Sequence, residues 1–232
     1  MASLALVPDN SVCFRQHQYL AREHDRPDAI YRIEEGWACR FHLLSDGRRQ
    51  ITALFLPGDY CEPQWGLGQR VTQPIVALTR VRAARIACLP AAGRSCDHYY
   101  NLWMALVTTV ERQAGWLVSL GRKNAQERIA QLLCEIYDRM HESGLAHAQQ
   151  CAMPLTQSVI ADITGLTPVH VNRTLQAMRM AGLIRLQSKW LHIRDMEGLR
   201  RSATCPAPAL DTRKMLLNMR SAPMTLPSAV RF

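Results

Sequence analysis

Polar side chains with the hydrogen-bonding chemistry of base recognition are concentrated in residues 169–176. Arginine can pair with guanine through two hydrogen bonds, and asparagine or glutamine can pair in the same way with adenine. At about 100° per residue, a helix over this segment turns an apolar stripe inward, formed by Val171, Thr174, Leu175 and Met178. The side chains outside this stripe are predicted to contact bases in the major groove, and Asn172 among them lies on the flank of the helix. They are Val169, His170, Asn172, Arg173 and Gln176.

The residues before this helix predict a helix-turn-helix unit. Thr156 can cap a first short helix, which Gly165 would end in a left-handed turn. Thr167 can cap the second helix, and Pro168 suits its first position because the missing N–H costs nothing there. Two short helices joined by a tight turn place the second helix in the major groove.

A two-stranded wing is predicted after Gly182, from residues 183–186 and 190–193. Phosphate contacts fix the position of a protein on DNA without specifying the sequence. We predict such contacts from the hydroxyl groups of Thr156 and Thr167 and from Lys189 on the wing.

Positive charge is concentrated in the same part of the chain. Residues 156–232 carry 11 Lys and Arg against 4 Asp and Glu, which gives +7 of the total net charge of +9. A polyanion such as double-stranded DNA is a suitable partner, because each neutralised phosphate releases condensed counterions. A solvated basic surface would give the same count, so charge alone does not decide between them.

A long helix is predicted over residues 99–122, where apolar residues recur in steps of three, four and seven. A stripe this narrow favours pairing with a second identical helix, although a helix packed only on its own domain remains an alternative. Gln113 lies on the stripe, where a polar residue can fix the register. The predicted homodimer interface is Trp103, Leu106, Val110, Gln113, Leu117 and Leu120.

Residues 29–88 predict short antiparallel strands that form a barrel or roll. The strand over 37–44 would place alternate residues on one face, namely Trp37, Cys39, Phe41 and Leu43. Asp46-Gly47 supplies the turn to a return strand over 50–55, and two more strands are predicted over 75–78 and 81–86. A further helix is predicted over 125–141.

The sequence gives little support for a metal-binding protein, an enzyme or a membrane protein. The eight cysteines are scattered without a C-x-x-C pair, so we predict no metal site and expect mostly buried thiols, with Cys151 as a candidate redox-sensitive one. Residues 29–88 contain no H-x-H or H-x-x-x-H pattern, and we expect no enzyme activity. Without a long apolar run or a basic leader, the chain is expected to be soluble and cytoplasmic, with no membrane partner.

Residues 29–200 resemble the Crp/Fnr family of bacterial regulators. The resemblance rests on the turns 46–50 and 57–59, on the run 125–130, and above all on 154–156 through 172–175. It implies an α+β fold with an N-terminal antiparallel β-roll (jelly-roll-like) of the cyclic-nucleotide-binding type, a dimerisation helix and a winged helix-turn-helix. The corresponding domains are 1–98, 99–122 and 123–201, followed by a flexible basic tail over 202–232. The resemblance also places the family's base-reading arginine at Arg173 and implies RNA polymerase as a further partner.

The sequence departs from this family in two places. The Glu and the Arg-Ser pair that hold cyclic AMP in some members correspond here to Pro63 and Gln73-Pro74, so we predict no cyclic-nucleotide binding and no other cofactor. Arg70 and Gln73 remain as a possible effector pocket. Val169 occupies a position where many members carry a Glu that accepts a hydrogen bond from cytosine, which predicts a different preference at that base pair.

The leading hypothesis is a homodimeric, sequence-specific transcription regulator that binds a palindromic operator with half-sites one helical turn apart. The alternative is a ligand-binding or protein-docking module that no longer binds DNA. Binding to random duplex DNA at two salt concentrations would distinguish the two, because the second predicts no binding even at low salt.

Overall fold

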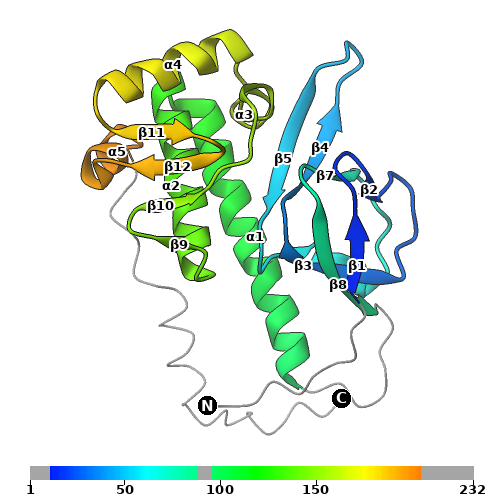
Figure 1. Ribbon diagram of the computed structural model, residues 1–232. Coiled ribbons are helices and arrows are strands. Elements are labelled where there is room, and N and C mark those ends of the chain that lie inside the picture. Colours follow the sequence, from blue (N-terminus) through cyan, green and yellow to red (C-terminus); the bar gives the residue numbers. More distant parts are fainter. Residues whose placement is uncertain (1–10, 88–95, 205–232) are drawn as a thin grey trace, which may run out of the picture.

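The computed structural model describes residues 11–87 and 96–204. A β-roll lies on one side of a long helix, and a domain of helices and short strands lies on the other side (Figure 1). The α+β architecture predicted from the sequence is therefore confirmed.

The β-roll consists of two antiparallel four-stranded sheets, with the orders β1-β8-β3-β6 and β2-β7-β4-β5. The strands are Ser11–Phe14 (β1), Tyr19–Ala21 (β2), Ala29–Glu35 (β3), Ala38–Leu43 (β4), Arg49–Phe55 (β5), Tyr60–Cys61 (β6), Ile75–Ala77 (β7) and Val81–Ala87 (β8). Ile30, Ile33 and Ile75 are fully buried between them, together with Trp65 from the short 3-10 helix η1 (Pro63–Leu67). Each such side chain contributes about 1.5–3 kcal/mol by leaving water.

Two tight turns of the roll require glycine. Gly47 has a φ of 84° between β4 and β5, as the Asp46-Gly47 pair predicts. Gly36 has a φ of 83° between β3 and β4, and a Cβ atom there would lie 2.0 Å from the carbonyl oxygen of Arg80. The β4–β5 hairpin, which Gly47 closes, extends away from the body of the roll (Figure 1).

The long helix α1 spans Cys96–Arg122 and has the β-roll on one side and α2 on the other (Figure 1). It starts three residues earlier than predicted. The next helix, α2 (Ala125–Glu142), begins with a capping box in which Asn124 and Glu127 bond each other's backbone N–H groups. The link between the two helices is therefore only two residues long.

The C-terminal domain packs three helices and a small sheet around α2. Its other elements are β9 (Ala146–His147), β10 (Gln150–Ala152), α3 (Gln157–Thr164), α4 (Pro168–Met180), β11 (Ile184–Gln187), β12 (Trp190–Ile193) and α5 (Met196–Ser202). The sheet has the order β11-β12-β10-β9. Ile129, Leu133 and Ile136 of α2 share one apolar core with Leu175 of α4, so the helix-turn-helix unit rests on α2.

The β4–β5 hairpin also contacts the C-terminal domain. Nη2 of Arg49 is paired with Oδ2 of Asp162 on α3 at 2.6 Å, and Nε2 of Gln50 donates to the carbonyl oxygen of Ile163 at 3.1 Å. Beyond the end of β5, the carbonyl oxygen of Pro57 accepts a hydrogen bond from Oγ of Ser143, just after α2, at 3.1 Å. The β-roll and the helix-turn-helix unit thus touch directly within one chain.

Several details differ from the sequence predictions. Leu43 is 61% exposed, because it is the last residue of β4, at the turn to β5 rather than over the core. The strands β1, β2, β9 and β10 and the helix α5 were not predicted. The predicted tail over 202–232 begins too early, because Ser202 still belongs to α5 and Ala203 is buried. Residues 205–232 of that tail lie outside the described residues, as do 1–10 and 88–95 of the first predicted domain.

Candidate nucleic-acid interface

The two helices of the helix-turn-helix unit begin and end where the sequence predicts. Oγ1 of Thr156 accepts a hydrogen bond from the N–H of Val159 at 3.2 Å, and Oγ1 of Thr167 accepts one from the N–H of His170 at 3.2 Å. Gly165, with a φ of 66°, ends α3 in the left-handed conformation. The caps and the turn fix the angle at which α4 leaves α3.

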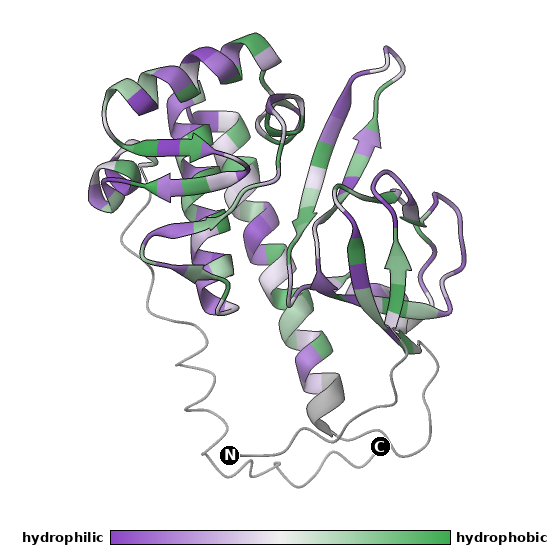
Figure 2. Ribbon diagram, viewed as in Figure 1, coloured by the Kyte–Doolittle hydropathy of each residue, from purple (hydrophilic) through white to green (hydrophobic). Residues whose placement is uncertain are grey.

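The helix α4 divides into a buried and an exposed face, as predicted. Its buried side chains are Val171, Thr174, Leu175 and Met178. Its exposed side chains include Val169, His170, Arg173 and Gln176, and Asn172 is half-buried on the flank. Figure 2 shows the resulting alternation of hydrophobic and hydrophilic residues along α4. Arg173 therefore lies free at the surface of the chain, where it can enter a DNA groove.

The predicted phosphate-binding side chains border this face. The hydroxyl oxygens of Thr156 and Thr167 are used as caps, which leaves each hydroxyl hydrogen available to a phosphate. Lys189 is exposed in the β11–β12 turn, where Ser188 and Lys189 have φ values of 52° and 64°. A groove of about 700 Å³ runs between the start of α2 and α4, and Arg173, His170 and Thr167 are among its lining residues.

Asn172 has a partner that sequence reasoning did not identify. Nε2 of Gln157, the first residue of α3, donates to Oδ1 of Asn172 at 3.1 Å. The two residues are 15 positions apart, so only the packing of α3 against α4 brings them together.

Half of the predicted dimer stripe on α1 is open to solvent in the single chain. Trp103, Val110 and Leu117, spaced by seven residues, are 64%, 59% and 74% exposed. Leu106, Gln113 and Leu120 lie between them and are half-buried. Large apolar side chains at heptad spacing that remain this exposed are typical of a helix with a missing partner.

The possible effector residues Arg70 and Gln73 differ in their surroundings. Arg70 is exposed, whereas Gln73 belongs to a chain of hydrogen bonds inside the roll. Oγ1 of Thr52 donates to Oε1 of Gln73 at 2.6 Å and accepts from Nε of Arg40 at 3.0 Å.

Arg40, at the end of this series of hydrogen bonds, also forms a buried ion pair. Its Nη1 lies 2.6 Å from Oε1 of Glu62, and the two side chains are 11% and 4% exposed. Burial raises the pKa of Glu62, and the opposing effect of Arg40 does not restore its ordinary value. The interior of the roll thus contains its own polar partners.

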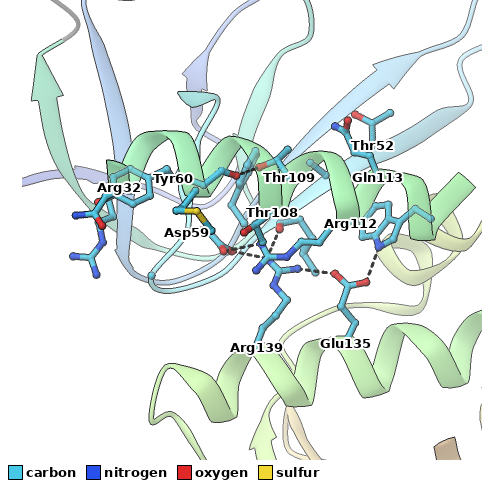
Figure 3. A pocket seen from close by; sticks show the side chains of 18 of the residues that line it. Arg32, Thr52, Asp59, Tyr60, Thr108, Thr109, Arg112, Gln113, Glu135 and Arg139 are labelled. Atoms are coloured by element: carbon cyan, nitrogen blue, oxygen red, sulfur yellow. Dashed lines mark hydrogen bonds and ion pairs between the residues drawn. The ribbon is translucent and has the colours of Figure 1, made fainter. Parts of the chain in front are cut away.

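A cavity of about 490 Å³ lies where β5, β6, α1 and α2 meet (Figure 3). Asp59 of the roll projects into it and pairs with Arg139 of α2 and, at 2.9 Å, with Arg112 of α1. Glu135 accepts from Nη1 of Arg139 at 2.9 Å and from Nε1 of Trp116 at 2.6 Å. These side chains join the roll, α1 and α2 in one network.

The two arginines determine the charge state of Asp59. Burial raises the pKa of Asp59, but Arg139 and Arg112 outweigh it and hold the pKa below its usual value. Sequence reasoning missed this network, although a charged Arg139 on the apolar stripe of α2 was a signal that could have revealed it.

Four of the five thiols that the structure describes are buried, as predicted. Cys39, Cys61, Cys134 and Cys151 are buried, and Cys13 is exposed. Burial raises the pKa of Cys151 to about 11, so almost none of it is thiolate at neutral pH. This environment does not support the redox-sensitive role suggested for Cys151.

Over the described residues, no group of three or more His, Cys, Asp or Glu side chains could hold a metal ion. In the same part of the chain, no helix combines the length and the apolar character that crossing a membrane requires.

Comparison with protein families matches both parts of the chain. Residues 11–87 match the cyclic nucleotide-binding domain, and residues 127–202 match the Crp-like helix-turn-helix domain. The first match coincides with the β-roll and the second with the domain that contains α3 and α4.

Individual proteins match over most of the chain. The nitrogen fixation regulation protein FixK of Azorhizobium caulinodans is 33% identical over 74% of this chain and 70% of its own length. The transcriptional activator protein FnrL of Cereibacter sphaeroides is 29% identical over 71% of this chain and 68% of its own length. The solved structure of FixK2 from Bradyrhizobium japonicum superposes with a TM-score of 0.73, at 26% identity, over 85% of this chain and 98% of that one.

Proposed function

The chain belongs to the Crp/Fnr family of transcription regulators, and we propose that it reads its operator through the exposed face of α4. Regulators of this family bind DNA as dimers and are not enzymes. The base-reading side chains in this proposal are His170, Asn172, Arg173 and Gln176, with Val169 as an apolar contact.

One observation carries the proposal: Arg173 stands exposed on a helix whose opposite face is fully packed. Because the buried face anchors α4, the guanidinium group can enter the major groove without any change in the fold. Thr156, Thr167 and Lys189 lie around this face and are proposed to bind phosphates, which supply affinity rather than sequence preference.

A second copy of the chain is proposed to pair along α1. The exposed heptad positions Trp103, Val110 and Leu117 support this, because they would leave water in a parallel helix pair. Leu106, Gln113 and Leu120 would complete the seam. A two-fold dimer presents two α4 helices and therefore requires a palindromic operator. RNA polymerase is the further partner we propose for the DNA-bound dimer, as the target through which a promoter-bound regulator acts.

The β-roll is proposed to act without a cyclic nucleotide. Arg40 and Glu62 neutralise each other inside the roll, and Gln73 is bonded to Thr52, so these polar groups need no ligand. Titration calorimetry of the full-length protein with cyclic AMP and cyclic GMP should give no binding heat. A saturable heat with either nucleotide would refute this part of the proposal.

The experiment that tests DNA reading compares Arg173→Ala with Arg179→Ala, which removes the same charge from the last turn of the same helix. Operators are first selected from random duplexes, and affinities are then measured on the selected site and on unrelated DNA. Arg173→Ala should cost about 1–3 kcal/mol on the selected site and flatten the preference at one base pair. Arg179→Ala should leave base preferences unchanged. Equal losses for Arg173→Ala on both DNAs would contradict the role of Arg173, and no binding at low salt would favour a docking module instead.

A further inference from the structure

A side-chain hydrogen bond joins the two helices of the helix-turn-helix unit beside the exposed face of α4. Nε2 of Gln157 donates to Oδ1 of Asn172 at 3.1 Å. Asn172 directly precedes Arg173 in the part of α4 that would lie deepest in the groove. The bond therefore acts on a side chain that is a candidate for base contact.

Both residues are held by rigid backbone. Gln157 follows the cap Thr156 at the first position of α3, and α4 is fixed by the cap Thr167 and by the fully buried Val171. Asn172 is itself half-buried, whereas Gln157 is exposed, so their hydrogen bond lies at the surface of the chain. The hydrogen bond from Gln157 therefore favours one direction of this amide before DNA is bound.

The orientation of the amide has a chemical consequence for recognition. An asparagine that recognises adenine uses its carbonyl oxygen and its NH₂ group together. In this chain the carbonyl oxygen of Asn172 is turned toward Gln157, which leaves the NH₂ group as the part free to face the groove. Such a donor suits the acceptors of guanine, adenine and thymine, whereas cytosine offers only a donor in the major groove.

We propose that Gln157 is a positioning residue for base recognition, which orients Asn172 as a hydrogen-bond donor to one base of the operator. This inference rests on the proposed function, since it concerns which base α4 selects. It changes the expected role of Asn172 from a two-bond adenine contact to a single donor that disfavours cytosine on the contacted strand.

The test uses full-length protein and an operator selected from random duplexes, with each base pair replaced in turn by the other three. Asn172→Ala identifies the base pair that Asn172 reads. Gln157→Ala should reduce discrimination at that same base pair by roughly two- to tenfold, the usual effect of one neutral hydrogen bond. Discrimination at the base pair read by Arg173 should stay unchanged. The double variant should lose no more than Asn172→Ala alone, because Gln157 acts only through Asn172.

Gln157→Glu provides a sharper readout. A carboxylate cannot donate to Oδ1 of Asn172 but can accept from its NH₂ group, which turns the amide and presents Oδ1 to the groove. The preference at this base pair should then move toward bases that carry a donor, adenine and cytosine. The added negative charge lowers affinity for all sequences alike, so ratios between sequences are compared. Ser158→Ala, at the exposed neighbouring position of α3, is the matched control and should leave all ratios unchanged.

Two results would overturn the inference while leaving DNA reading by α4 intact. In one, Gln157→Ala weakens binding equally on every sequence, which is the behaviour of a phosphate contact. In the other, neither Gln157 variant alters the ratio at the base pair identified by Asn172→Ala. If the wild-type protein selects no sequence at all, the proposed function fails and this inference fails with it.

Discussion

Replacing Asp59 by asparagine tests whether the buried ion pairs hold the C-terminal domain against the β-roll. Oδ2 of Asp59 accepts from the N–H of Leu56 at 2.7 Å and pairs with Arg139, and Oδ1 accepts from Nη1 of Arg112 at 2.9 Å. Asparagine has nearly the same size but carries no charge and offers one acceptor oxygen instead of two. The substitution therefore removes the attraction without creating a cavity.

The expected loss follows from the surroundings of the two arginines. Removing one partner of a buried pair costs about 3–5 kcal/mol. Arg139 is only 7% exposed, but it keeps Glu135 and the carbonyl oxygen of Leu54 as partners. Arg112 is 31% exposed and can be hydrated instead. We therefore expect the lower end of the range, about 3 kcal/mol of unfolding free energy at neutral pH.

The loss should depend on pH in a defined direction. The folded-state pKa of Asp59 lies below the value of about 3.9 that applies in the unfolded chain. Its stabilisation is therefore complete above that value and is lost as the pH falls through the folded-state pKa. The difference between wild type and Asp59→Asn should be level from about pH 8 to pH 5 and should shrink below about pH 4.

Urea unfolding followed by circular dichroism measures this difference. Asp28→Asn, which breaks the exposed pair with Arg85, is the control and should cost less than about 1 kcal/mol. A loss for Asp59→Asn that is no larger than the control would refute the reasoning. A difference that grows as the pH falls would refute the assigned charge state of Asp59.

Three other predictions concern dimerisation, folding and thiol reactivity. Leu117→Asp should give a monomer in analytical ultracentrifugation, because it places charge in the exposed apolar seam; an unchanged dimer would count against the seam. Gly36→Ala should yield little folded protein, since its Cβ would overlap a backbone carbonyl at a φ of 83°, whereas Gly121→Ala, with open space around it, should fold normally in the same circular dichroism assay. Iodoacetamide at about pH 8 should modify Cys13 in the folded protein and spare Cys151, as mapped by mass spectrometry; rapid labelling of Cys151 would disprove its burial.

The parts of the structure that the sequence predicts well are those specified locally. The caps at Thr156 and Thr167 each act on a backbone N–H three residues away, so their signal is contained in a few residues. The faces of α4 and the stripe on α1 follow from helix periodicity. The caps and the faces of α4 were sufficient to predict the helix-turn-helix unit.

The parts that the sequence did not predict depend on distant residues. The short strand β1 pairs with β8, some 70 residues later, and Arg49 meets Asp162 across 113 residues. No local pattern identifies such partners. The wing turn adopts left-handed backbone at Ser188 and Lys189 without a glycine, which turn chemistry alone does not suggest.

The half-buried Gln113 in the middle of the α1 stripe bears on how far apart the two DNA-reading helices of a dimer would stand. Sliding one α1 past the α1 of the second copy by one heptad would move one C-terminal domain about 10 Å along the helix axis. The two α4 helices could then no longer bind one straight duplex at the same time. Gln113 also lines the cavity between the roll, α1 and α2 (Figure 3). In an aligned pair of α1 helices each Gln113 would lie beside its own copy, whereas a pair slipped by one heptad would set it against Leu106 or Leu120. A glutamine that weakens the seam would in this way preserve the spacing on which the recognition of paired half-sites depends.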